Sequence, residues 1–422
     1  MPAHLLSNAT AVLREVIQPY VQDNFPKQTI LLDQMKRNSG VATINNAFHA
    51  AVRTSRHGGV TNLANDGNNI NATAGVTFNR GSVAVKTVTG AFNISKLAID
   101  ASQGDKRAIA NTFTEQAKAM VSDFAREVNR QLYGDATGIV AQVNGSVSST
   151  EITIRAINAS VDDGRTIDYY GTVNSDIAPG AYLQDGMVVG IGTAAAATGT
   201  IGTITNRGKD LAVGTVLLTG ATASAANDAV FILDGSGGGA GSNMFNGIRE
   251  ALSSTTGTNL YAGLARSRDG WTPQFGSVSE ALSLSRMENG YLSAKEYART
   301  GDQYAIFVNK TLYKKYGDLL TSMRRTVDTA DLLGGWTGLE FAAGAGKVGV
   351  FLDYQVPDGE VVILNMDSWT LCQVEDMNWL EQGADNLLRL SNTITYQAVM
   401  VWFANVMCLA PAANARETQK TD

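Results

Sequence analysis

The sequence predicts an α+β fold into which an all-β domain is inserted, and three observations lead to this prediction. Apolar residues recur at three- and four-residue spacing from Asp105 to Tyr133, as on one face of a long helix. Residues 38–100 hold few helical signals and contain stretches in which apolar and polar residues alternate, as in half-buried strands. Residues 139–240 hold short β-rich runs separated by Gly, Asn and Asp, which is typical of a small antiparallel barrel or sandwich.

Composition bounds the class of protein. The chain has 422 residues, 44% hydrophobic and 17% charged, which is enough for two or three domains with a substantial core. Its longest apolar stretch, residues 398–411, is shorter than the roughly 18 residues that cross a bilayer, so we expect a buried strand and no membrane association. Residues 1–11 lack a basic start and an apolar run, so no secretory signal is expected. Two unpaired, buried cysteines, Cys372 and Cys408, would fit a reducing cytoplasm.

The first hundred residues are predicted to form two projecting segments. Residues 1–37 form an amphipathic N-terminal arm, in which Pro19 ends a short helix and Pro26 keeps the following chain extended. Residues 38–100 form an extended loop, which we interpret as a long β-hairpin with turn residues at its tip. Because a lone hairpin is only marginally stable in water, its faces need a partner, which in an assembly is the next subunit.

A long helix and the inserted domain follow. The helix within residues 101–138 is about 43 Å long at 1.5 Å per residue, and it ends at the glycine break Gly134–Gly138. The inserted β domain, residues 139–240, closes at a glycine-rich linker. This domain carries nine acidic and four basic residues (net −5), whereas the extended loop carries five basic and two acidic residues (net +3). A basic loop and an acidic body can attract each other between copies of the chain.

The rest of the chain is predicted to have α+β character. Residues 241–385 are expected to form a domain of strands and helices, with one helix from Phe275 to Met287 and another capped by Asn309. Residues 386–422 are expected to supply long apolar strands and then a polar, loose tail after Pro411.

Several short motifs stand in a defined order along the chain. They are Phe92–Ser102 before the helix, Leu132–Gly138 at its end, Asn246–Ile248 after the insertion, and then Phe307–Lys310, Leu333–Gly335, Val356–Gly359, Trp369 and Cys408–Pro411. In this order they resemble the major capsid proteins of tailed bacteriophages, the HK97-type fold family. Leu132–Gly138 is similar to the family's glycine-rich stop, with Ala136 in place of its middle glycine. The resemblance covers about 320 of the 422 residues and leaves out the insertion.

The resemblance implies a structural shell protein and not an enzyme. The implied fold is HK97-like, with an N-terminal arm, an extended loop, a spine helix, a peripheral domain and an axial domain. Hexamers and pentamers would self-assemble into an icosahedral head that encloses double-stranded DNA without sequence-specific binding. Further implied partners are a separate scaffolding protein and a portal; the location is the virion, assembled in the cytoplasm of a host bacterium. We expect the acidic insertion to face outward, because negative charge lining a DNA-filled cavity would be repelled.

Two other functions stay open at this point. One is an encapsulin-type compartment, which shares the fold and holds protein cargo. The other is a tail or surface protein whose β domain binds carbohydrate, and a chain that stays monomeric at high concentration would favour it.

The sequence shows no catalytic constellation. Histidine occurs three times, in the arm and the loop, and no nucleophile, zinc or paired-cysteine motif is found, so we expect no catalytic residue, metal or cofactor. Gly344–Gly349 matches the G-x-G-x-x-G pattern, but strand-like residues follow where a dinucleotide site needs a helix. A glycine turn between two strands is therefore the favoured interpretation.

The candidate functional residues lie in the extended loop, and we predict that they contact adjacent subunits. They are Arg53, Arg56, Phe78, Arg80 and Lys86. The alternative is a solvated hairpin edge, where basic side chains discourage aggregation. By resemblance, Lys86 or Lys96 could serve as a cross-linking lysine. The chain lacks a dense Lys/Arg cluster with interleaved aromatic residues, which argues against a DNA-binding patch.

Overall fold

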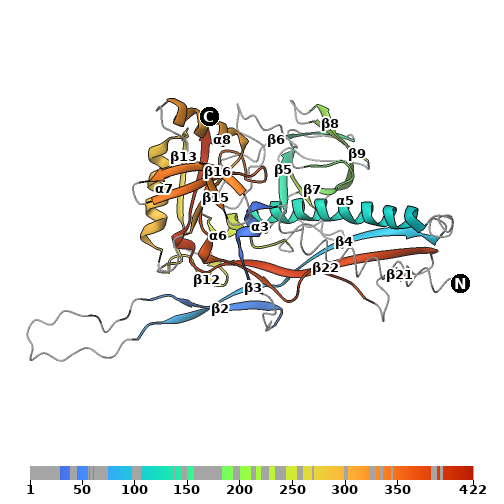
Figure 1. Cartoon of the computed structure of the whole chain (residues 1–422), viewed down its shortest axis with the longest axis horizontal. Helices are drawn as coiled ribbons and strands as arrows, with labels where there is room; N and C mark the ends of the chain where they lie inside the picture. The colour runs from blue at the N-terminus through green and yellow to red at the C-terminus, as the bar shows by residue number, and fades with distance from the viewer. Residues whose placement is uncertain are drawn as a thin grey trace, which may run out of the picture.

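The structure is a computed structural model of the whole chain (Figure 1). It describes residues 29–38, 45–55, 57, 60, 75–96, 106–136, 138–143, 150–155, 183–192, 200–210, 215–219, 228–232, 244–253, 260–268, 270–298, 303–322, 329–332, 336–343, 346–381, 387–389 and 393–421. In these residues a long helix lies along one sheet, a barrel and a second sheet flank the helix, and a hairpin projects from the body.

A six-stranded sheet carries the long helix. Its central strand is β22 (Thr395–Cys408), and β4 (Lys86–Ser95) pairs along one edge of it, from Ser95 opposite Thr395 to Lys86 opposite Ala404. Three short strands pair along the other edge: β19 (Trp369–Gln373), β20 (Asn378–Trp379) and β21 (Leu387–Arg389). A further strand, β1 (Lys36–Asn38), pairs with β19 in parallel.

The predicted long helix is confirmed as α5 (Lys106–Tyr133). Val121, Phe124, Val128 and Leu132, on the face predicted from the apolar spacing, are buried. The helix packs closely on β4, because a Cβ built at Gly90 would lie 3.0 Å from the sulfur of Met120. The helix and sheet therefore form one layered body.

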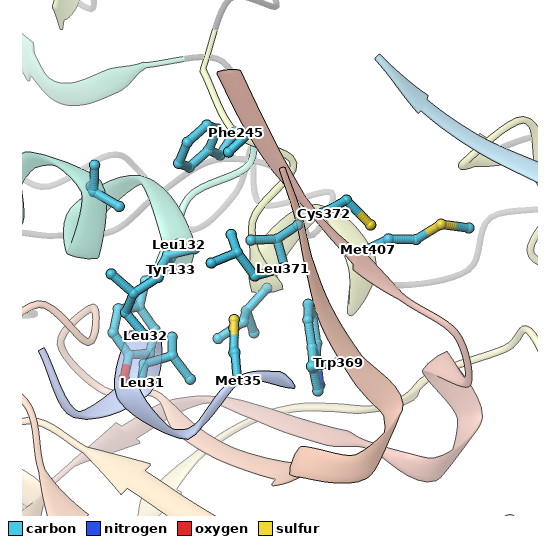
Figure 2. Close-up of a cluster of buried hydrophobic side chains, with 14 of the residues drawn as sticks. Leu31, Leu32, Met35, Leu132, Tyr133, Phe245, Trp369, Leu371, Cys372 and Met407 are labelled. Carbon is cyan, nitrogen blue, oxygen red and sulfur yellow. The ribbon is translucent and has the colours of Figure 1, made fainter. Parts of the chain in front are cut away.

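Residues 29–38 correct the prediction of an N-terminal arm over residues 1–37. They form helix α3 (Ile30–Gln34) and strand β1, and Leu31 and Leu32 are almost fully buried. Figure 2 shows these side chains and Met35 in one cluster with residues of α5 and β19. This segment therefore packs its apolar side chains within its own chain. The predicted arm residues 1–28 lie outside the described residues.

The extended loop predicted over residues 38–100 divides into two parts. Strands β2 (Ala47–Arg53) and β3 (Phe78–Ala84) pair in antiparallel fashion and confirm a hairpin. Strand β4 leaves this hairpin and joins the six-stranded sheet, so the predicted boundary at residue 100 is wrong. Strand β4 has the same two-residue period as the hairpin strands, so the local sequence does not distinguish it from them. Its partner β22 lies about 300 residues further along the chain.

Six strands close the barrel, in the order β10-β5-β6-β9-β8-β7. They are β5 (Ile139–Val143), β6 (Glu151–Arg155), β7 (Val188–Gly192), β8 (Thr200–Asp210), β9 (Thr215–Thr219) and β10 (Ala229–Ile232). Val140, Val189, Val216 and Val230 are buried in its own core, which is separate from the core beneath the long helix. The short β-rich runs of the sequence thus close on themselves.

A seven-stranded sheet forms the remaining part, in the order β13-β23-β18-β14-β17-β16-β15. Its strands are β13 (Gln274–Ala281), β14 (Tyr304–Val308), β15 (Thr329–Leu332), β16 (Trp336–Ala343), β17 (Gly346–Leu352), β18 (Val361–Asn365) and β23 (Ala415–Thr421). The associated helices are α7 (Leu284–Glu296) and α8 (Lys310–Ser322). Smaller elements are α6 (Ile248–Ala251), β11 (Leu260–Tyr261), β12 (Leu264–Ala265), η4 (Met366–Ser368) and η5 (Pro411–Ala413). Asn309 caps α8 as predicted, accepting a hydrogen bond from Leu312 N at 3.1 Å.

Two predictions for this part are wrong. Phe275 to Ala281 is strand and not helix, and only residues from Leu284 onward are helical. The polar tail predicted within residues 386–422 is not loose, because β23 lies inside the sheet between β13 and β18. Arg416 and Lys420 of this strand are buried and pair with carboxylates from distant segments.

Candidate functional site: the projecting hairpin

The pairing of β2 with β3 gives the hairpin two distinct faces. Directly opposed residues of antiparallel strands share a face. Arg53 is opposite Phe78, and Arg80 is opposite Ala51, two positions along both strands. The structure therefore brings three of the five predicted site residues together on one face, which we call the outer hairpin face.

The outer hairpin face is exposed and basic. The Phe78 side chain is 64% exposed, and both arginines are exposed. Arg53 Nε donates to Ser55 O at 3.0 Å, and Arg80 approaches the two ring nitrogens of His49 at 3.1 and 2.9 Å. Within the part of the chain that the structure describes, neither guanidinium has a carboxylate partner. Two arginines beside an exposed ring suit a protein interface, where Arg and aromatic residues dominate binding energy.

The opposite face of the hairpin is already used within the chain. Phe48, Val52 and Val83 alternate with the outer residues and belong to the core beneath the long helix. Gly81 packs on β22, since a Cβ there would lie 2.8 Å from the terminal carbon of Met407. In the described part of the hairpin, the outer hairpin face is therefore the more exposed of the two.

Lys86 does not join the outer hairpin face. Lys86 is the first residue of β4, at the base of the hairpin, where it lies opposite the buried Ala404 of β22. Its side chain is half-buried. Burial lowers the pKa of Lys86, and the nearby charge of Glu250 acts in the opposite direction. Arg56 lies outside the described residues, and Lys96 is half-buried at the far end of β4.

A buried polar cluster, which the sequence analysis missed, joins the hairpin to the body. The fully buried Asn405 donates through Nδ2 to Ala84 O and to Asn246 Oδ1, each at 2.6 Å. Asn246 N donates back to Asn405 Oδ1 at 2.9 Å, and Asn246 Nδ2 donates to Glu250 Oε2 at 2.5 Å. Burial raises the pKa of Glu250. The only signal in the sequence was the Asn246–Ile248 motif, which gave no indication of its partner Asn405.

Gly247, in the same motif, is required by the close approach of two backbones. A Cβ at this position would lie 2.7 Å from Leu132 O and even closer to Gln131 O and Gly134 O, at the end of α5. Because all three atoms are backbone, they cannot move aside as a flexible side chain would. We predict that Gly247→Ala lowers the free energy of unfolding by about 3 kcal/mol, as overpacking of a filled site does.

Urea denaturation followed by circular dichroism measures this effect. Gly317→Ala is the matched control, since Gly317 lies within α8 and a Cβ there would meet nothing within 4 Å. The control should raise stability by about 0.5–1 kcal/mol through helix propensity. Equal stabilities for the two variants would contradict the close approach at Gly247.

Among the described residues, no group of three or more His, Cys, Asp or Glu could hold a metal ion, and no helix is long and apolar enough to span a membrane. Residues 346–349 of the glycine pattern at 344–349 belong to β17, so this part of the pattern is strand and not helix. Cys372 and Cys408 are free and buried, as predicted.

The comparisons with known proteins give only structural matches. No family model and no curated protein matches the sequence. The structure is similar to the cyanophage A-1(L) capsid asymmetric unit, with a TM-score of 0.49 and 11% identity over 89% of both chains. The capsid of the native GTA particle gives a TM-score of 0.44 and 9% identity over 94% of this chain and 91% of the other.

A third similar structure is the holo-SrpI encapsulin complex from Synechococcus elongatus PCC 7942. It gives a TM-score of 0.42 and 9% identity over 93% of this chain and 87% of the other. The structural neighbours thus include phage capsid proteins and an encapsulin.

Proposed function

We propose that this chain is the major capsid protein of a tailed bacteriophage, a non-enzymatic subunit that self-assembles into an icosahedral shell. The observation that carries the proposal is the outer hairpin face, which projects from the body and exposes Arg53, Phe78 and Arg80 to solvent. Arginine and aromatic side chains are enriched at protein interfaces, so a neighbouring copy can cover this face.

The rest of the fold suits a subunit of a lattice. The inner face of the hairpin and the Asn405 cluster fix the hairpin to the helix-and-sheet body, so its direction is set before any neighbour arrives. A projection from one copy that meets a different surface on the next makes a heterologous contact, which generates rings when the rotation closes. In a shell these rings are the hexamers and pentamers.

The finer elements of the proposal follow from this function. The HK97-like assignment makes α5 the spine helix, the six-stranded sheet part of the peripheral domain, and the seven-stranded sheet the axial domain. The barrel is then a domain inserted between the peripheral and axial domains, facing outward because residues 139–240 carry a net charge of −5. A separate scaffolding protein and a portal would assist assembly in the host cytoplasm, and the head would enclose double-stranded DNA without reading its sequence.

Electron microscopy of the purified, concentrated full-length protein tests the proposal. We expect closed particles of uniform size, and cryo-EM maps with the barrel on the outer wall. The triple variant Arg53→Ser, Phe78→Ser, Arg80→Ser should remain folded and lose particle formation. A folded chain that stays monomeric at every concentration would overturn the shell function. The contents of particles from their natural source distinguish the shells: nuclease-protected DNA supports a phage head, and a protein cargo would show an encapsulin-type compartment instead.

A further inference from the structure

A buried carboxyl group joins the long helix to the seven-stranded sheet. Asp353 directly follows β17 and is 6% exposed, as is Asn129 near the end of α5. Asn129 Nδ2 donates to both carboxyl oxygens of Asp353, each at 3.1 Å, and Tyr133 Oη donates to Oδ2 at 3.1 Å. Gln355 N donates to Oδ1 at 2.9 Å from within the loop. One side chain of the sheet thus holds two positions of the helix.

The backbone of Asp353 belongs to the interior of the sheet. Its N–H donates to Val308 O at 3.0 Å, which continues the parallel pairing of β17 with β14. The ring of Tyr133 packs edge-on against Phe307 of β14, with the ring centroids 6.5 Å apart. Figure 1 shows this end of α5 beside the seven-stranded sheet. Asp353 therefore lies at the joint between helix and sheet, so its charge acts on both.

The groups that hold Asp353 are all neutral. Strand β14, with the sequence YAIFV, brings no charged side chain to the joint. On α5, Arg130 Nε donates to Glu127 at 3.0 Å, and in the loop after β17 Asp358 accepts from Asn309 Nδ2 at 2.5 Å. Among the described residues, no basic side chain forms an ion pair with Asp353. A buried carboxylate without a cation beside it is costly.

Burial therefore dominates the titration of this group. It raises the pKa of Asp353, and the hydrogen bonds that the carboxylate accepts act in the opposite direction without outweighing it. Burial and the adjacent carboxylate raise the pKa of Tyr133 well above its ordinary value, so its hydroxyl keeps its proton and remains a donor. Asn129 Oδ1 is buried and has no donor among the described residues. A proton on Asp353 would remove a buried charge and add a donor to a site in which an acceptor is unpaired.

We propose that the joint between α5 and the seven-stranded sheet is proton-sensitive, and that mild acid tightens it through Asp353. Near neutral pH the ionised carboxylate is held by neutral donors alone, and its buried charge weakens the joint. A proton removes this charge and leaves the same neighbours within hydrogen-bonding distance. This inference goes beyond the proposed function, because it concerns a joint within one chain and holds whether or not copies assemble.

The sign of the pH dependence follows from proton linkage. A carboxyl group whose pKa is higher in the folded chain than its unfolded value of about 3.9 takes up a proton on folding. Its ionised form costs stability above the folded pKa, and this cost disappears as the pH falls through the folded pKa. Between the folded and unfolded pKa, the folding equilibrium constant should rise about tenfold per pH unit, relative to a chain without this group.

Urea denaturation of the full-length chain at several pH values from 7 to 4 measures this dependence. Asp353→Asn removes the titration and keeps an acceptor for Gln355 N. We expect the ratio of folding constants, the unchanged protein over this variant, to rise on acidification. The comparison cancels the other carboxyl groups, which titrate in both proteins. The control Asp318→Asn makes the same substitution at an exposed position of α8, and the corresponding ratio should stay constant.

A second variant moves the titration without removing it. Tyr133→Phe takes one donor from the carboxylate and keeps the ring against Phe307, so the proton should bind more readily in the folded chain. The loss of stability in this variant should therefore be larger at pH 7 than at pH 4. A purely structural contribution of the hydroxyl would give the same loss at both pH values. This variant also tests the joint if Asp353→Asn does not fold.

The outcomes are distinct. A ratio for Asp353→Asn that rises on acidification, together with a smaller loss for Tyr133→Phe in acid, supports the proton-sensitive joint. A ratio that stays level or falls between pH 7 and 4 would overturn it, because the neutral donors would then keep the carboxylate ionised. An equal loss for Tyr133→Phe at both pH values overturns it as well. The measurements need no particles, so neither result bears on the proposed shell function.

Discussion

Ending the chain at Asn414 is expected to abolish folding of the seven-stranded sheet. This deletion removes β23, which pairs in parallel with β13 and in antiparallel fashion with β18. Both neighbours would lose their hydrogen-bonding partner in the interior of the sheet, and unpaired buried backbone groups are costly. The deletion also removes Arg416 and Lys420, which are 0% and 2% exposed.

Soluble expression and limited proteolysis measure this loss. We expect the truncated chain to aggregate, or to be cleaved rapidly at sites beyond residue 244. The control protein, which ends at Thr421, should resist cleavage in this part of the chain. The control lacks only Asp422, which lies outside the described residues, and should behave as the full chain. A truncated chain that unfolds at the same temperature as the full chain would show that β23 contributes nothing to the sheet.

The position of β23 shows what the sequence could not reveal. Its residues, Ala415–Thr421, are mostly polar, and a polar chain end is normally loose. Here the charges are paired with distant groups: Arg416 with Glu360, at 2.6 Å, and Lys420 with Glu280, at 3.0 Å. No local period or propensity encodes such a pairing, because its energy comes from partners more than 50 residues away.

Features with a strong local period were predictable. Helix α5 follows from seven apolar residues on one face, and the hairpin follows from alternation with turn residues between its strands. The prediction of a helix from Phe275 to Met287 was wrong for the same reason as the prediction of a loose tail: pairing with distant strands decides the structure. Its helical spacing was outweighed by pairing with β23, which places Gln274 opposite Ala415.

The candidate site was predictable in part. Arg53, Phe78 and Arg80 were singled out as charges and an aromatic ring in a projecting loop, and the register of the hairpin places them on one face. Lys86 looked equivalent in the sequence, but it pairs with β22, and its neighbours there come from the far end of the chain.

The second large effect is expected at Glu360, which lies between two buried arginines. Its Oε1 is 2.6 Å from Arg416 and 3.1 Å from Arg249, and all three side chains are almost fully buried. Glu360→Gln keeps the shape and removes the only negative charge of this triad. We predict a loss of about 3–5 kcal/mol in the free energy of unfolding at pH 7, as when one partner of a buried ion pair is removed.

Urea denaturation at pH 7 tests this prediction. The control is Glu296→Gln, which makes the same substitution on the exposed side of α7 and should leave the free energy of unfolding unchanged. The double variant Glu360→Gln, Arg249→Met should recover part of the loss, because one uncompensated charge is then gone. A single variant as stable as the control would mean that the triad does not stabilise the fold.

The pH dependence of the same variant gives an independent test. Burial acts to raise the pKa of Glu360, but the charges of Arg416 and Arg249 outweigh it and hold the pKa below its ordinary value. A carboxyl group whose pKa is lower in the folded state contributes stability above its unfolded pKa of about 4.3, and this contribution is lost as the pH falls through the folded pKa. The difference in stability between the unchanged protein and Glu360→Gln should therefore be constant from pH 7 to about 5 and shrink at lower pH. A difference that grew on acidification would mean that burial, and not the two arginines, controls this carboxyl group.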